Sequence, residues 1–212
     1  MSHARTGQTG LSLVELMIAL ALGLVVVAIA LEASVAQLRE SRQLLAEARL
    51  MQDLRTAADL VARTLRRAGH WRDAAAQVGT GAANPNAEWQ LDGGTYAVAH
   101  DRGASGRVDA AFRLREGALQ MRLGDGNWQA LTDASTSQVT AFTLTPDVRS
   151  TPLESACARP CPPGATACPP LIESRSVRLQ LEAQVVRQPA VRRRLETTLN
   201  LRNDPVVGAC PA

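Results

Sequence analysis

The stretch that decides the fold is residues 10–31, GLSLVELMIALALGLVVVAIAL, near the start of a 212-residue chain. From Leu11 onward, this stretch holds one charged side chain, that of Glu15. At about 1.5 Å per residue, a helix over residues 11–31 spans roughly 30 Å, which is the thickness of the hydrocarbon core of a bilayer. The sequence therefore predicts a membrane-spanning helix at residues 11–31.

A short polar leader, residues 1–10, precedes this helix and carries Arg5 but no acidic residue. Positive residues favour the cytoplasmic side, so we expect the leader in the cytoplasm and everything after Leu31 to be exported. A carboxylate inside lipid is costly, so Glu15 predicts a partner of opposite charge. A conventional cleaved signal peptide and a plain uncleaved anchor both fit less well, since the apolar run is long and contains Glu15.

The segment GLSLVEL, residues 10–16, resembles the type IV prepilin cleavage and methylation signal. The resemblance implies that a prepilin peptidase cuts between Gly10 and Leu11 and that the new amine of Leu11 is N-methylated. It also implies that Glu15 neutralises the N-terminal amine of an adjacent subunit during filament assembly. Phenylalanine is common in the family where this chain has Leu11, which is a conservative departure.

The helical pattern continues past the membrane, because residues 32–68 contain no proline and no glycine. Gly69 follows Arg66 and Arg67, and a glycine after basic residues is typical of a helix end. We therefore expect an amphipathic exported half of the same helix at residues 32–68, packed on a following sheet. Its apolar positions recur at helical spacings: Leu38, Leu45, Leu54, Val61 and Leu65.

Residues 69–212 predict a β-rich head domain, so the expected fold class is α+β, a long N-terminal helix packed on an antiparallel sheet. Residues 73–88 are rich in Ala, Gly and Asn and predict a loop. Residues 146–170 hold seven of the eleven prolines and predict a Pro/Cys-rich loop. Short β-compatible segments predict the strands at 89–98, 107–115, 118–123, 128–131, 138–145, 176–187 and 191–202.

All four cysteines, Cys157, Cys161, Cys168 and Cys210, lie in the region expected to be exported. An even set in an oxidising compartment predicts two disulfides that staple the loop, one of them joining Cys210 back to it. Three connectivities are compatible with the sequence. A zinc site is a weaker interpretation, because the spacing lacks paired short knuckles and no histidine lies nearby, so we expect no metal.

A second resemblance covers most of the chain. Residues 48–71, where the helix ends, and residues 199–203 resemble PilW-type minor pilins and the related J-type pseudopilins of type II secretion. The resemblance implies a type IV pilin-like protein of the inner membrane with a periplasmic head, which helps to initiate pilus assembly. Its partners would be prepilin peptidase, other minor pilins, the major pilin and the inner-membrane assembly platform. Roles in twitching motility, adhesion or DNA uptake stay open.

Two alternatives remain. A J-type pseudopilin would use the same helix, and a deletion strain scored for twitching and for protein secretion would separate it from a pilin. A membrane-anchored periplasmic binding module, with the loop at 146–170 as its recognition surface, would have an unprocessed or conventionally cleaved N-terminus.

Composition argues against several other classes. All 23 basic residues are arginine, but the formal net charge is only +3, too small to predict nucleic-acid binding. The densest basic run, residues 192–194, is a candidate for an anionic partner, although a solvated hairpin edge explains it more simply. The three histidines are scattered and no catalytic or phosphate-binding motif occurs, so we expect no enzyme and no cofactor.

Overall fold

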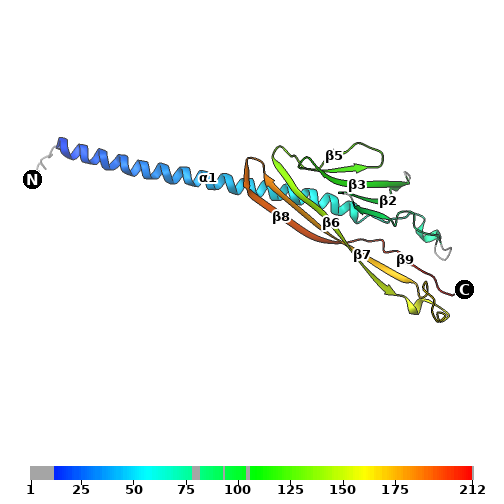
Figure 1. Cartoon of the computed structure of the whole chain (residues 1–212). Coiled ribbons are helices and arrows are strands. Elements are labelled where there is room, and N and C mark those ends of the chain that lie inside the picture. Colours follow the sequence, from blue (N-terminus) through cyan, green and yellow to red (C-terminus); the bar gives the residue numbers. More distant parts are fainter. Residues whose placement is uncertain (1–11, 78–81, 93, 104–105, 212) are drawn as a thin grey trace, which may run out of the picture. The chain divides into compact units, whose positions relative to one another are not determined.

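The computed structural model describes residues 12–77, 82–92, 94–103 and 106–211. Its contacts divide the chain into two units, residues 1–45 and residues 46–212, which are treated separately below. One long helix, α1 (Leu13–Leu65), contributes to both units, as the ribbon shows (Figure 1).

In the first unit, α1 exposes apolar side chains around its whole circumference, among them Leu16, Val25 and Leu31. By length and composition this helix can cross a membrane. Leu38 and Leu45 are also exposed, at 58% and 57%, so the prediction that they belong to a buried stripe was wrong. They fall in the first unit, before the stretch of α1 that packs on the head.

In the second unit, α1 buries a regular stripe against the head domain. The stripe residues lie three or four positions apart, which places them on one face of the helix. Three of them are alanines, whose small side chains let the helix lie close to its neighbours. The buried residues are Leu50, Leu54, Ala57, Ala58, Val61, Ala62 and Leu65.

The first sheet is an antiparallel meander of five strands in chain order. Residues 89–98, predicted as one strand, form parts of two strands because the chain turns at Gly94, whose φ of +74° suits glycine. A short 3-10 helix, η1 (Ala74–Gln77), precedes the sheet. The strands are β1 (Trp89–Asp92), β2 (Thr95–Asp101), β3 (Arg107–Arg115), β4 (Ala118–Leu123) and β5 (Gln129–Ala130).

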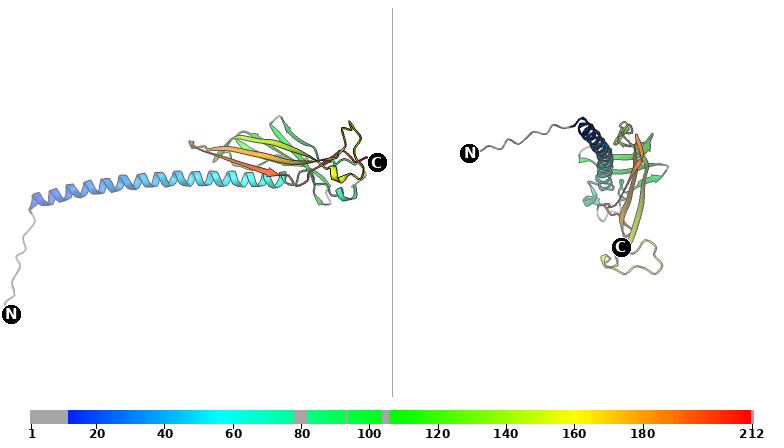
Figure 2. Two further views of the ribbon diagram at one scale, coloured as in Figure 1. Left: turned by 90° about the horizontal axis from the view of Figure 1, so that it is seen from below. Right: turned by 90° about the vertical axis from the view of Figure 1, so that its left-hand side faces the viewer.

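The second sheet is built on long antiparallel strands, β6 (Ser137–Pro152), β7 (Leu171–Val185) and β8 (Gln188–Asn200). A two-residue strand, β9 (Val206–Val207), pairs with the start of β7, beyond the residues that β8 covers. The second half of α1 lies beside both sheets (Figures 1 and 2).

The prediction of a loop at 146–170 was wrong for its first seven residues, because residues 146–152 continue β6. Pro146 and Pro152 stand opposite Val177 and Leu171 in the ladder with β7. In the described structure β6 pairs with β7 alone, so it is an edge strand, where a residue without an N–H is tolerated. The irregular segment is therefore residues 153–170, which contains a short 3-10 helix, η3 (Glu154–Ala156).

One hydrophobic core joins the helix to both sheets. Phe112 of β3 and Leu179 and Leu181 of β7 are fully buried in it together with the stripe of α1. Tyr96 of β2 meets Phe142 of β6 edge to face, with ring centroids 5.1 Å apart. The prediction of a long helix packed on antiparallel sheet is confirmed, with two sheets where the sequence predicted one.

The stripe makes a prediction about stability. Leu54 is 1% exposed, so Leu54→Ala removes buried methyl groups and leaves a cavity, and we expect the free energy of unfolding to fall by about 2–5 kcal/mol. Leu44→Ala, at a 59% exposed position of the same helix, is the matched control. Urea unfolding of the full chain in detergent, followed by tryptophan fluorescence, measures both. Equal losses in the two variants would contradict the packing described here.

Candidate functional site

The start of α1 is capped by a side chain. The N–H of Glu15 donates to Oγ of Ser12 at 3.3 Å, and the N–H of Leu16 donates to the Ser12 carbonyl at 3.1 Å. Ser-x-x-Glu at a helix start is the capping-box pattern, a sequence signal that the prediction of a helix from Leu11 did not include. It places Glu15 in the first turn, at the positive end of the helix dipole.

Glu15 is exposed, and its carboxylate makes no ion pair with any residue that the structure describes. The cationic partner predicted for Glu15 is therefore not among the described residues. Gly10 and Leu11, the predicted cleavage and methylation positions, lie outside the described residues.

The other end of α1 is fixed by hydrogen bonds in its last turns. The N–H groups of Arg67 and Ala68 bond to carbonyls three residues back, which tightens the chain, and Gly69 then adopts a φ of +75°. The regular helix consequently ends at Leu65, a little before the predicted Ala68.

Three asparagine side chains donate to the carbonyls that follow the helix, groups that have no partner within the helix itself. The carbonyls of residues 68, 69 and 70 accept, in that order, from Asn203 at 2.9 Å, Asn84 at 2.8 Å and Asn86 at 2.8 Å. The carbonyl of His70 also accepts from the N–H of Asp101 at 2.9 Å. Asn84 and Asn86 come from the loop before β1, whereas Asn203 comes from the segment after β8. The helix exit is thus held by hydrogen bonds from two segments of the head that are far apart in the sequence.

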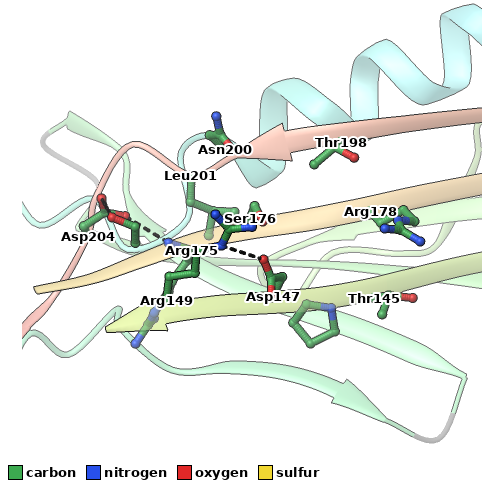
Figure 3. A pocket seen from close by; sticks show the side chains of 12 residues that line it. Thr145, Asp147, Arg149, Arg175, Ser176, Arg178, Thr198, Asn200, Leu201 and Asp204 are labelled. Carbon is green, nitrogen blue, oxygen red and sulfur yellow. Dashed lines mark hydrogen bonds and ion pairs between the residues drawn. The ribbon is translucent and has the colours of Figure 1, made fainter. Parts of the chain in front are cut away.

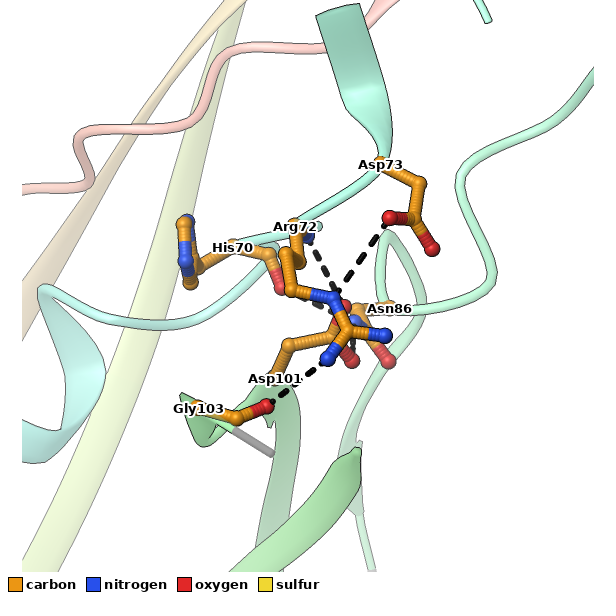
Figure 4. A network of polar contacts seen from close by, with 6 residues as sticks. All are labelled: His70, Arg72, Asp73, Asn86, Asp101 and Gly103. Carbon is orange, nitrogen blue, oxygen red and sulfur yellow. Dashed lines mark hydrogen bonds and ion pairs between the residues drawn. The ribbon is translucent and has the colours of Figure 1, made fainter. Parts of the chain in front are cut away.

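A polar network extends this anchor to the end of β2 (Figure 4). The carboxylate of Asp101 accepts from the N–H of Arg72 and from the amide of Asn86, both at 2.9 Å. These hydrogen bonds hold the pKa of Asp101 below its usual value. The Arg72 side chain donates to the Gly103 carbonyl at 3.2 Å, while the ring of His70 projects away from the network (Figure 4).

His70 instead lines a hollow of about 360 Å³, called here the arginine hollow. Three of its arginines and His70 follow the helical spacing i, i+3, i+4, i+7, so they share one side of the helix exit. This spacing is the sequence signal for a basic surface at the helix exit, which the sequence-based prediction did not include. The lining consists of Arg63, Arg66, Arg67, His70, Arg202 and Asn203.

A second hollow of about 280 Å³ adjoins the first, since both are lined by Arg63 and Arg67. Arg102 and His100 also line it. His100 is only 5% exposed. Burial lowers the pKa of its imidazole, and the nearby cations Arg67, His70 and Arg102 lower it further, while Asp101 opposes them.

The basic run at residues 192–194, the candidate from the sequence, is largely neutralised. Arg193 forms an ion pair with Glu47 of α1. Arg194 pairs with Glu182 at 3.5 Å and with Glu196 at 3.3 Å. These contacts connect β8 to α1 and to neighbouring strand positions, so they give the run a structural role.

Another hollow, of about 760 Å³, lies over β6, β7 and β8 (Figure 3). Its charges are mostly matched within the chain. Arg149 pairs with Asp147 at 3.5 Å, and Asp204 accepts from the N–H of Arg175 at 3.2 Å. The side chain of Arg175 is only 14% exposed and donates to Glu173 and to the Ala87 carbonyl. The lining is polar but offers no histidine or cysteine.

The four cysteines form two disulfides, Cys157–Cys210 and Cys161–Cys168. The disulfide-stapled loop is therefore confirmed, and the first bridge joins the C-terminal segment to it. The C-terminal end of the chain lies near this loop in the ribbon (Figure 2). The sulfur atoms of Cys157, Cys161 and Cys168 lie within 4.8 Å of one another. Because all three are oxidised, none offers a thiolate to a metal.

A long apolar helix with one early carboxylate, followed by a disulfide-bonded head of antiparallel sheets, defines a pilin-like protein. Residues 5–31 match the prokaryotic N-terminal methylation motif. Residues 43–201 match the model of prepilin peptidase-dependent protein B, and the chain belongs to this family. No curated protein and no solved structure matches the chain.

The two matches establish the broad nature of the chain. It is a pilin-type protein processed by prepilin peptidase, and its apolar helix together with the methylation motif indicates membrane anchoring. The first match spans the residues predicted for processing and for assembly, Gly10, Leu11 and Glu15.

The environment of His100 predicts a pH dependence. Its folded-state pKa lies below the unfolded value of about 6.5, so the unfolded chain binds a proton first and stability falls on acidification. We expect the free energy of unfolding to decrease from about pH 7.5 to about pH 5.5, and to decrease less in His100→Gln. His70→Gln removes one of the groups that lower the pKa of His100, so we expect it to weaken the pH dependence less than His100→Gln does, because burial is the larger cause. An unchanged pH profile in His100→Gln would contradict this assignment.

Proposed function

We propose that this chain is a minor pilin of the PilW type that takes part in initiating type IV pilus assembly. In this proposal prepilin peptidase cuts between Gly10 and Leu11, and Leu11 is then N-methylated. The observation that carries the proposal is the exposed apolar part of α1, with the lone carboxylate of Glu15 in its first turn. The match of residues 5–31 to the methylation motif supports the same processing.

The proposed orientation places the N-terminus in the cytoplasm and the head in the periplasm, with one pass through the inner membrane. Arg5 before the apolar segment supports this orientation. The two disulfides also support it, because such bonds persist in oxidising compartments. Partners in this setting are other minor pilins, the major pilin and the inner-membrane assembly platform.

The proposed mechanism is physical. An exposed apolar helix can leave lipid for a bundle of similar helices with little loss of hydrophobic stabilisation, because both surroundings are apolar. Charges are different, since the Glu15 carboxylate and a free N-terminal amine are both costly when unpaired away from water. Pairing them between subunits fixes the stagger of one helix along the next.

Processing is tested at the N-terminus. We expect mass spectrometry of protein extracted from native membranes to find N-methyl-Leu11 as the first residue. Gly10→Val places a branched side chain beside the scissile bond and should leave the leader attached, whereas the control Gly7→Val should be processed normally. An intact leader in the unsubstituted protein, or a start after the apolar segment, would overturn the proposal.

Assembly is tested at Glu15. Glu15→Ala and Glu15→Gln should still be cut after Gly10 but should assemble poorly, because both remove the negative charge. The capping hydrogen bond to Ser12 uses the backbone N–H of residue 15 and is kept in both variants, and glutamine also keeps the size of the side chain, so equal defects in the two variants assign the effect to charge. The readout is piliation of a deletion strain complemented with each variant.

Glu32→Gln, which removes an acid at the far end of the apolar segment, is the matched control and should assemble normally. Normal piliation with Glu15→Ala would contradict the pairing mechanism. A deletion strain that keeps twitching but loses protein secretion would assign the chain to a J-type pseudopilin instead.

A further inference from the structure

The arginine hollow gathers positive charge that the fold does not neutralise. Arg63, Arg66, Arg67 and Arg202 make no ion pair within the described part of the chain, and all four are exposed. Elsewhere in the head, arginines such as Arg107, Arg175 and Arg194 do have acidic partners. No carboxylate lines the arginine hollow or the hollow beside it.

Helix stability alone does not explain this cluster. Cations in the last turn of a helix interact favourably with the dipole, which accounts for Arg66 and Arg67. Arg202, however, comes from the segment after β8 and is brought to the same hollow by a different part of the chain. Like charges at i and i+4, such as Arg63 and Arg67, repel each other. An anionic ligand would remove that repulsion.

The arrangement suits a polymer with regularly spaced anions better than a single small ion. Arg63 and Arg67 line both hollows, so cationic groups continue from Arg202 on one side to Arg102 on the other. Burial is the main cause of the lowered pKa of His100, and Arg67, His70 and Arg102 add to it. Guanidinium groups bind phosphate oxygens in a bidentate manner, which makes a phosphodiester backbone the best chemical match.

From these observations we infer that the arginine hollow and its neighbour form a binding surface for the backbone of double-stranded DNA. No Trp, Tyr or Phe lines either hollow, so the surface lacks the stacking platforms that single-stranded nucleic acids use. Binding through phosphates alone is independent of sequence and depends strongly on salt. The inference concerns the head surface and does not require the assembly role proposed above.

The test measures binding of the full chain in a neutral detergent to a short fluorescein-labelled duplex of mixed sequence, by fluorescence anisotropy over a series of salt concentrations. If the four arginines of the hollow each contact a phosphate, the slope of log K against log salt should be about −4. In Arg66→Gln/Arg202→Gln the slope should fall to about −2 and binding at 0.1 M salt should weaken roughly 10–100-fold.

The matched control is Arg187→Gln/Arg192→Gln, which removes the same charge from exposed positions of the β7–β8 hairpin. It should bind DNA like the unsubstituted chain. Thermal unfolding of both double variants checks that each is folded, and because the four positions are exposed we expect unchanged melting temperatures.

Three outcomes would overturn the inference. One is unchanged affinity and slope in Arg66→Gln/Arg202→Gln, and another is an equal loss in the two double variants, which would show a response to net charge alone. The third concerns the ligand: tighter binding of a single strand, or of a uronic-acid polysaccharide at the same concentration of negative charge, would assign the surface to a different polyanion.

Discussion

The packing of one face of α1 against two sheets is the constraint on which the rest of the structure depends. Neither sheet closes its own core, and the stripe from Leu50 to Leu65 fills the space that both leave open. The stripe is therefore where the helix buries its apolar face against the head, while the apolar surface before it stays available for lipid or for other helices. One helix can therefore contact lipid or other helices through its first part and the core of the head through its last part, because its buried face begins only at Leu50.

The helix exit connects this packing to the charged surface. Asparagines from two distant segments fix the carbonyls at residues 68–70, and Asn203 is the neighbour of Arg202 in the chain. The same local geometry thus caps the helix and brings Arg202 to the side of the exit where Arg66 lies. Asn203 thus has a structural role, while Arg202 beside it belongs to the proposed binding surface.

Much of this architecture could be predicted from the sequence, because an apolar pattern that continues over many residues is a strong signal. The apolar run, the helix end near Gly69 and the strands at 107–115 and 118–123 all follow from local patterns. The continuation of β6 through Pro146 could not be predicted, since proline is tolerated there only because β6 lies at an edge. The location of unpaired positive charge was harder still to predict. The dense run at 192–194 is paired within the fold, whereas Arg202 becomes part of a basic surface only through tertiary structure.

The bond between Cys157 and Cys210 closes a covalent ring that contains β7, β8 and β9. A protease that cuts the backbone once inside this ring leaves the two pieces still joined through sulfur. The nicked chain keeps β7 and β8 at high local concentration, so the sheet can reform from the same molecule. A head on the outside of a cell would thus tolerate a single cut in its second sheet without shedding the strands that complete its core.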